Sequence, residues 1–155
     1  PWDIDPARAI ELALECEAAA LDADPRITNS EGASVGTSDG IRVYGNTHGF
    51  LAGYRSTEHS VSCAVVGAED GAMETDYEYA VARDPARLPA PAATGREAGL
   101  RTARRLGAGR LSTRTAPVLF PARHARGLMG SLLGAIGGGA QYRRASFLVD
   151  HAGKP

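Results

Sequence analysis

The sequence contains little cysteine, few aromatic residues and almost no lysine. Its 155 residues include two cysteines, one tryptophan and one lysine, and aromatic residues make up 6%. Two cysteines cannot form the disulfide framework of a small secreted domain, and neither has the spacing of a zinc knuckle or a redox C-x-x-C motif. We therefore expect the chain to work in a reducing compartment, the cytoplasm.

Long hydrophobic runs are also missing. The longest uncharged stretch, residues 127–142, is rich in glycine and shorter than the ~20 apolar residues of a membrane-spanning helix. No basic segment followed by an apolar one opens the chain, so we expect no signal peptide and no membrane association. Because the first residue is Pro1 and not Met, we expect a processed chain or an excised fragment. The 43% hydrophobic and 23% charged residues are typical of a globular domain and exclude disordered and collagen-like chains.

The net charge of −1 conceals two halves of opposite charge. Residues 1–80 contain 15 acidic residues and four arginines, whereas residues 81–155 contain three acidic and 13 basic residues. A basic half can bind nucleic acid. Alternatively, the two halves complement each other within one fold or across a subunit interface. The second interpretation is favoured because the arginines are not interleaved with aromatic residues, so nucleic acid is a disfavoured partner.

Residues 5–24 predict a helix. Asp5 is a candidate N-cap, and Pro6 occupies the first helical position, where its missing N–H costs nothing. The Asp24-Pro25 step ends the helix. Apolar residues at three- and four-residue spacing predict its buried face: Ile10, Leu14, Ala18 and Leu21.

Residues 26–79 predict strands and tight turns. Short apolar runs alternate with glycines, and residues 38–40 and 46–49 have turn compositions. In the run 60–66, Val61, Cys63 and Val65 share one face, and residues 73–80 predict a fifth strand. We expect an antiparallel β meander that packs through one face on the first helix.

The remaining residues predict helices around one short strand. The proline-rich residues 84–93 are expected to form a linker or covering loop. Residues 94–97 have the form of a capping box, followed by a helix that ends at Gly107. A buried strand over 115–120 and a helix over about 122–136 come next. The fold class is therefore α+β: an antiparallel β meander packed with flanking helices, followed by a strand-helix unit that begins the next domain.

Residue spacing alone identifies no active site. The histidines are isolated in sequence, without the H-x-x-x-H spacing that places two imidazoles around a metal: His48, His59, His124 and His151. His48 is expected in a turn and His59 on the solvent side of a strand, while Cys16 and Cys63 are expected in the core. The glycine-rich segment 134–139 follows a helix, so it predicts a helix stop and a flexible loop rather than a phosphate cradle. We assign no catalytic, cofactor-binding or metal-binding residue to this chain.

A series of short segments, in order along nearly the whole chain, carries a family resemblance. The segments are Cys16, Ala19-Ala20, residues 24–33 (DPRITNSEGA), 44–50 (YGNTHGF), the serine-rich 56–63, Met73, 77–79, 105–108, 117–120 and 142–148 (YRRASFL). They resemble the PmbA/TldD family of bacterial peptide-processing metalloproteases, and within it the PmbA (TldE) branch. The resemblance implies a longer chain with three domains. Residues 1–110 would then form the central domain, and residues 111–155 would begin the C-terminal domain.

The resemblance also bears on zinc. The partner branch, TldD, carries H-E-x-x-x-H on the helix that corresponds to residues 122–136 of this chain. Here that helix holds residues 129–134 (MGSLLG) where the ligands and the catalytic glutamate would lie. No glutamate follows Glu97, and no histidine lies between His124 and His151. A zinc-polarised water needs both ligands and a base, so the resemblance implies no cofactor in this chain and zinc in a partner subunit.

The resemblance therefore implies the non-catalytic PmbA/TldE-like subunit of a TldD/TldE-type zinc metalloprotease complex that degrades or matures unstructured peptides. The expected partners are a TldD-like zinc subunit or a second copy, together with a peptide held on the exposed meander face by main-chain pairing. Two alternatives stay open. One is a DNA- or gyrase-associated modulator that binds through the basic half. The other is an active homodimeric peptidase whose ligands lie outside these residues.

Overall fold

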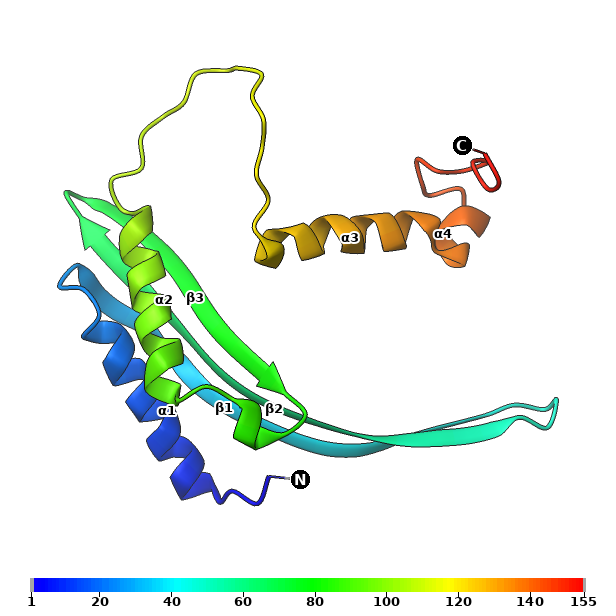
Figure 1. Ribbon diagram of the computed structural model, residues 1–155, viewed down its shortest axis with the longest axis horizontal. Helices are drawn as coiled ribbons and strands as arrows, with labels where there is room; N and C mark the ends of the chain where they lie inside the picture. The colour runs from blue at the N-terminus through cyan, green and yellow to red at the C-terminus, as the bar shows by residue number, and fades with distance from the viewer. Residues whose placement is uncertain (1, 155) are drawn as a thin grey trace. The chain divides into compact units, whose positions relative to one another are not determined.

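The computed structural model describes residues 2–154. They form two compact units, which divide between Arg110 and Leu111. The first unit contains, in order, α1 (Pro6–Leu21), β1 (Ile27–Gly45), β2 (Leu51–Glu69), β3 (Ala72–Ala82), the 3₁₀ helix η1 (Pro85–Arg87) and α2 (Pro91–Arg105) (Figure 1). The second unit contains α3 (Ala122–Ile136) and α4 (Gly138–Tyr142).

The first unit is an antiparallel sheet of order β1-β2-β3 with α1 and α2 on one face (Figure 1). This confirms the predicted α+β class, with three long strands in place of five short ones. Residues 38–40, predicted to form a turn, lie inside β1. The pairing of β1 with β2 continues without a shift from Ala33 opposite Cys63 to Gly45 opposite Leu51. Asp39 also forms an ion pair with Arg55 on the neighbouring strand at 2.8 Å, so its polar side chain supports the strand.

Two hairpin connections set the register of the sheet. Asp70 and Gly71 join β2 to β3 with φ values of 50° and 79°, as the common two-residue hairpin turn requires. The predicted turn at residues 46–49 is confirmed at the tip of the β1–β2 hairpin. Its Asn46 side chain accepts hydrogen bonds from the backbone N–H groups of His48 and Phe50 at 3.0 and 3.2 Å. Gly49 supplies the positive φ of 86° that closes this turn.

The segment 29–32 (Asn-Ser-Glu-Gly) introduces an irregularity into β1. The register shifts twice, between Ile27 and Asn29 and between Ser30 and Gly32. Ser30 Oγ accepts a hydrogen bond from the N–H of Gly32 at 2.8 Å, and Gly32 has a φ of 111°. A shift of this kind is a β-bulge, which bends a strand and increases its twist. The physical role of this segment is therefore to curve β1 around the core.

Helix α1 begins as predicted but buries a different face. Asp5 caps it by accepting a hydrogen bond from the N–H of Arg8 at 2.7 Å, and Pro6 is the first helical residue. The predicted apolar face is wrong, because Ile10 and Leu14 are 60% and 58% exposed. The completely buried residues of α1 are the small ones, Cys16 and Ala20. Small side chains face inward because α2 approaches the backbone of α1 too closely for large ones.

Helix α2 starts four residues earlier than predicted. It begins at Pro91, whose fixed φ suits the first helical position, and its N-cap Ala90 makes no side-chain cap. The predicted capping box is therefore wrong, and Thr94 is buried inside the helix. Gly95 and Gly99 face α1. A Cβ atom at Gly95 would lie 1.8 Å from the carbonyl oxygen of Cys16, and one at Gly99 would lie 2.4 Å from that of Ala20.

The core lies between these helices and the inner face of the sheet. It consists of Cys16, Ala20, Ile27, Val61, Cys63, Val65, Ala98 and Ala103. The predicted alternation of β2 and the core positions of both cysteines are thus confirmed. Since most of these side chains are small, close packing of the backbones helps to fill the core.

In the second unit, α3 spans the predicted residues, but the strand predicted over 115–120 is absent. This segment is extended and exposed, and no strand lies beside it in the described part of the unit. A strand requires a paired neighbour, which this unit does not supply among its described residues. The glycines after α3 stop it as predicted, but residues 138–142 form the short helix α4 instead of a flexible loop. Over residues 2–154, no helix combines the length and apolar character needed to cross a bilayer.

Candidate functional site

The four histidines occupy four separate places. His48 lies at the exposed hairpin tip, His124 is exposed near the start of α3, and His151 is exposed near the chain end, with its Nδ1 3.0 Å from the carbonyl oxygen of Val149. Within residues 2–154, no three histidine, cysteine or acidic side chains gather into a group that could hold a metal ion. The features that remain as candidates in the first unit are two surfaces.

The prediction that His59 faces solvent is wrong. The residue is completely buried, and the alternation that it shares with Val61 and Cys63 places it on the helix-covered face. Its Nδ1 shares a hydrogen bond with Thr37 Oγ1 at 2.8 Å, and the ring of Trp2 lies edge to face against its ring, with the centroids 5.7 Å apart. Its Nε2 has no hydrogen-bond partner among the described residues. His59 thus lies where the pairing of β2 with β3 ends and the β1–β2 hairpin continues alone.

The two cysteines lie in the core. Cys16 on α1 and Cys63 on β2 are both buried and unoxidised. A hydrogen bond between the two thiols and burial in the core raise the pKa of Cys16 above that of a free thiol. A thiol that stays protonated at neutral pH is a poor nucleophile and a poor metal ligand.

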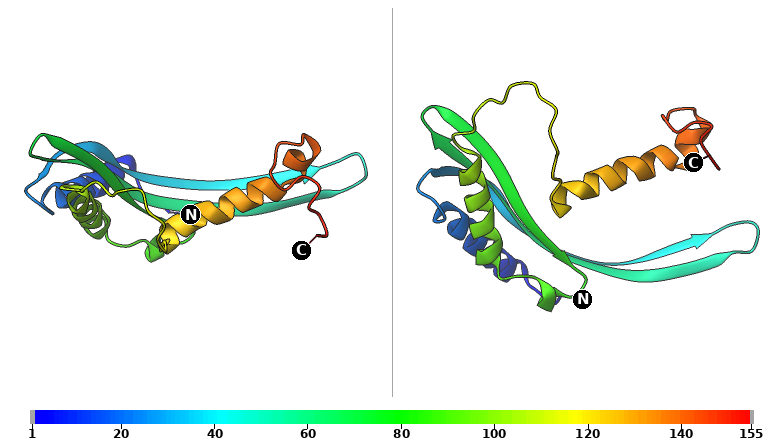
Figure 2. Two further views of the ribbon diagram at one scale, coloured as in Figure 1. Left: turned by 90° about the horizontal axis from the view of Figure 1, so that it is seen from above. Right: turned by 45° about the horizontal axis from the view of Figure 1, so that its top comes forward.

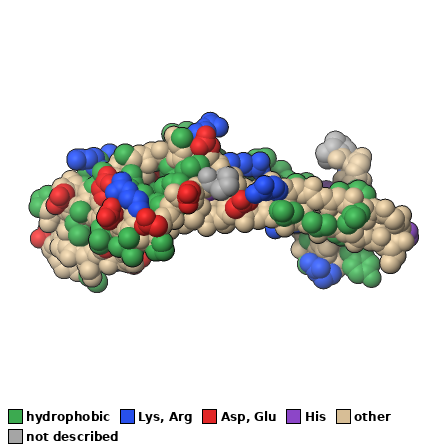
Figure 3. All heavy atoms as spheres, turned by 90° about the horizontal axis from the view of Figure 1, so that it is seen from below, with side chains coloured by type: hydrophobic (Ala, Val, Ile, Leu, Met, Phe, Trp, Pro, Cys, Tyr) green, Lys and Arg blue, Asp and Glu red, His purple; other side chains and the backbone are tan. Residues whose placement is uncertain are grey.

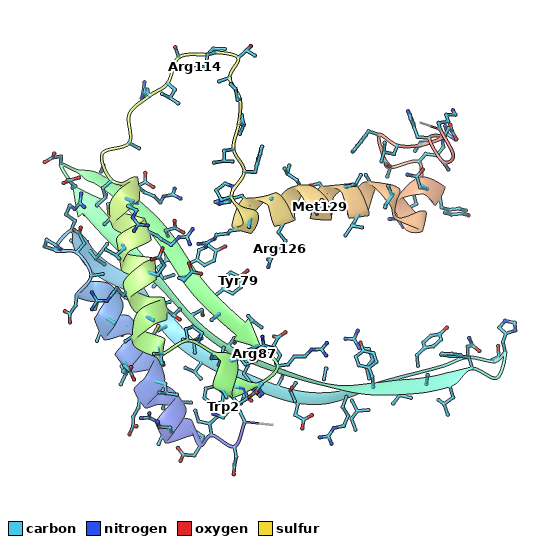
Figure 4. All side chains as sticks on the ribbon, viewed as in Figure 1. Trp2, Tyr79, Arg87, Arg114, Arg126 and Met129 are labelled. Atoms are coloured by element: carbon cyan, nitrogen blue, oxygen red, sulfur yellow. The ribbon has the colours of Figure 1, made fainter. Side chains whose placement is uncertain are left out.

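The face of the sheet opposite the helices is the first candidate surface. Ser34 and Ser62 lie on neighbouring strands with their Oγ atoms 2.8 Å apart. On β3, Tyr77 and Tyr79 stack with their ring centroids 6.1 Å apart, and Tyr79 projects from the face that α2 does not cover (Figure 4). β1 and β3 are the edge strands of this sheet. Edge strands present N–H and C=O groups that can pair with another extended chain.

The second candidate surface is a two-stranded hairpin that extends beyond β3. Pairing of β2 with β3 ends at His59 opposite Ala82, whereas β1 and β2 stay paired as far as the turn at residues 46–50. We call residues 38–58 the arm. Both views in Figure 2 show it reaching past α1, α2 and β3. Large apolar and aromatic side chains cover it, each 54–76% exposed: Ile41, Val43, Tyr44, Phe50, Leu51 and Tyr54 (Figure 3).

Charges within the first unit pair between α2 and β3. Arg101 contacts Glu78 at 2.6 Å, and Arg105 contacts Glu74 at 3.0 Å, with Asp76 about 4 Å from both arginines. The arginines belong to the basic half of the sequence and the carboxylates to the acidic half. The opposite charges of the two halves are thus used, in part, to fix α2 on the sheet.

Comparison with known proteins identifies the family to which the first unit is similar. Residues 1–106 match the family described as the PmbA/TldA metallopeptidase central domain, which covers most of the first unit and two thirds of the chain. The chain belongs to the PmbA/TldA metallopeptidase family. This confirms the resemblance seen in the sequence, and the family match ends just after Arg105, the last residue of α2.

Curated relatives extend the match into the second unit. The chain is 48% identical over 154 residues to Metalloprotease PmbA of Escherichia coli O157:H7, and 46% identical over 152 residues to the Metalloprotease PmbA homolog of Haemophilus influenzae. The alignments cover 99% and 98% of this chain but only 34% of each relative. The chain therefore spans about a third of the length of these family members.

A solved structure shares the fold. It comes from Thermotoga maritima and is described as a candidate modulator of a DNA gyrase. It aligns with a TM-score of 0.83 and 16% identity over 95% of this chain and 34% of that one. At this identity the likeness concerns the fold alone.

Residue spacing could not reveal the two candidate surfaces described above, because they depend on where β3 and the two helices end along the β1–β2 hairpin.

Proposed function

We propose that this chain is part of a PmbA/TldE-type subunit that carries no zinc of its own and completes the cleavage chamber of a TldD-like zinc peptidase subunit. The composition of α3 carries this proposal. In the family resemblance, α3 corresponds to the helix that bears H-E-x-x-x-H in the zinc branch. Residues 129–134 of this chain offer no imidazole or carboxylate there, and zinc hydrolases draw their ligands and base from such groups.

The proposed contribution to substrate binding comes from the open face of the sheet. An extended peptide that pairs with the edge of β1 or β3 would be held mainly through its main chain. Such binding depends little on which side chains the peptide carries, which suits unstructured peptides of varied sequence. The small residues Ser34 and Gly36 of β1 leave the peptide backbone room to approach the sheet.

The first experiment measures zinc in the full-length protein, purified without chelator, by elemental mass spectrometry. We expect well below one zinc atom per chain, no peptidase activity alone, and activity when the TldD-like subunit is added. About one zinc atom per chain, with activity alone, would contradict the proposal and favour an active homodimer with ligands outside residues 1–155. An unchanged peptidase rate when this chain is omitted would refute the accessory role.

A DNA-binding function has one supporting observation, the excess of basic residues in residues 81–155. It is weakened by the pairing of Arg101 and Arg105 with carboxylates of β3, which leaves less positive charge for phosphate. Retention on double-stranded DNA tests it. Real phosphate contacts would make affinity fall by ~10³-fold or more between about 50 and 200 mM salt. We expect weak retention even at the lower salt concentration.

A further inference from the structure

The arm is apolar on both of its faces. Along a strand, side chains alternate between faces. Val43 and Leu51 therefore lie on the face that continues from the helix-covered side, whereas Tyr44 and Tyr54 lie on the opposite face. No helix and no third strand of the first unit covers either face over its described residues. A lone two-stranded hairpin is marginally stable in water, so this arrangement needs a surface that encloses it.

The base of the arm, where it joins the rest of the sheet, is held by hydrogen bonds and an ion pair. This favours a preformed docking element over a flexible loop. Thr57 donates a hydrogen bond to the carbonyl oxygen of Arg83 at 2.7 Å. Thr37 and the buried His59 share a hydrogen bond across the strand pair, and Asp39 pairs with Arg55 one step further out. An element with a fixed direction loses less conformational freedom when it binds.

The charge and area of the arm match a protein interface. Between residues 38 and 58 the charged side chains are two acidic and two arginine residues, so the arm carries no net charge and does not attract polyanions or anionic membranes. Its six large side chains present roughly 600 Å² of apolar and aromatic surface, with roughly 150–200 Å² for a whole side chain. A standard interface buries about 800 Å² per partner, and tyrosine and arginine are enriched in such interfaces.

From these observations we propose that the arm docks into the partner subunit, inserted between two of its surfaces, and that it is the main contact holding the two subunits together. The inference rests on the proposed function, since it takes the TldD-like zinc subunit as the occupant. A single substrate peptide would cover one strand edge and leave both apolar faces in water. A folded subunit with a groove covers both faces.

The end of α2 lies far from the tip of the arm within the first unit. At the end of α2, Leu106 packs against Gly67, beside the β2–β3 turn. Gly67 and Leu51 are both on β2, and the sixteen residue steps between them span about 50 Å at the rise of a strand. The segment that follows α2 therefore starts at the opposite end of the sheet from the hairpin tip.

The test compares assembly of the full-length chain with the TldD-like subunit for three forms of the chain. The arm variant combines Val43→Asp and Tyr54→Asp, which places one charge on each face. The matched control is Met73→Asp, because Met73 is 74% exposed but lies outside the arm. We expect the dissociation constant, measured by analytical ultracentrifugation, to rise by ~100-fold or more in the arm variant and to stay within about threefold in the control.

Hydrogen exchange on the wild-type protein identifies the occupant. We expect the amides of the arm to exchange rapidly in the free full-length chain and to become protected in the complex. Protection already present in the free chain would overturn the inference, because the chain itself would then cover the arm. Normal assembly of the arm variant, including assembly with lost peptide cleavage, would also overturn it and leave the proposed function intact. Failure of the wild-type chain to form any complex would refute the proposed function itself.

Discussion

At the scale of single residues, the α1–α2 contact depends on glycines, which have no side chain. We expect Gly95→Ala to lower the free energy of unfolding by about 3 kcal/mol, because its Cβ would overlap the carbonyl group of Cys16 and force the two helices apart. Urea unfolding of the full-length protein measures this. The matched control is Gly130→Ala in α3, where an added Cβ meets no atom within 4 Å.

The control substitution also has an expected effect on the free energy of unfolding. Replacing an unhindered glycine inside a helix by alanine stabilises that helix by up to ~1 kcal/mol, so Gly130→Ala should be neutral or favourable. Equal effects of the two substitutions would contradict the close backbone contact between α1 and α2.

Asp24 gives the chain a specific pH dependence. Its carboxylate accepts hydrogen bonds from the side chain and the backbone N–H of Arg26, and these lower the pKa of Asp24 from 3.8 to about 2. A lowered folded-state pKa means that the stabilisation is complete above the unfolded-state value and is lost as pH falls through the folded-state value. We therefore expect the stability difference between wild type and Asp24→Asn to be constant above about pH 5 and to shrink between about pH 4 and 2.

Two measurements check this expectation. Urea unfolding at a series of pH values gives the stability difference, and an NMR titration of the Asp24 carboxyl carbon gives the midpoint, which should lie near 2. A midpoint near the ordinary value of 3.8, or a stability difference that does not change down to about pH 2, would show that the Arg26 contacts do not form in solution.

At the scale of elements, ion pairs help to hold α2 on β3. In a double-mutant cycle with Arg101→Ala and Glu78→Ala, we expect a coupling energy of about 1 kcal/mol, because both side chains are largely shielded from water. The exposed pair of Arg8 and Glu11 on α1 should give only about 0.3 kcal/mol in the same experiment. Thermal unfolding at two salt concentrations measures both, and a coupling for Arg101 no larger than that of the exposed pair would contradict this role.

The fold class and most element positions could be predicted from the sequence. Predictions from local residue patterns were correct where a single rule decides the structure. The examples are the Asp5 cap, the alternation of Val61 to Val65, and the Asn46 turn. Such predictions failed where tertiary packing decides. The apolar spacing of α1 pointed to Ile10 and Leu14, but the close approach of α2 selects small residues instead. Glycine in residues 38–40 suggested a turn, although the partner strand continues alongside.

The candidate surfaces were less accessible to prediction. His59 could have been placed correctly, since it has the same alternation as Val61 and Cys63. The arm could not, because the exposure of Tyr44 or Leu51 follows from the length of β3, which ends twelve residues after the turn at Asp70-Gly71 begins. Apolar alternation in a strand indicates burial, but it does not say whether the covering surface belongs to the same compact unit.

At the scale of the whole molecule, the first unit divides into a packed part and the arm. Every residue of the buried core lies in α1, α2 or the strand segments beneath them, and none lies between residues 38 and 58. Regions with few buried apolar contacts open at low free energy, independently of the core. The arm should therefore contribute to assembly and very little to the stability of the free chain.

Shortening the arm separates these two contributions. Replacing residues 40–56 by Asn-Gly would join Asp39 directly to its cross-strand partner Thr57 through a two-residue hairpin turn. We expect the melting temperature of the full-length protein to change by less than about 4 °C, the shift that roughly 1 kcal/mol produces in a small domain. Calorimetry measures this, and size-exclusion chromatography should show reduced self-association because the exposed apolar surface of the arm is gone. Loss of a cooperative transition would mean that the arm is part of the folding core after all.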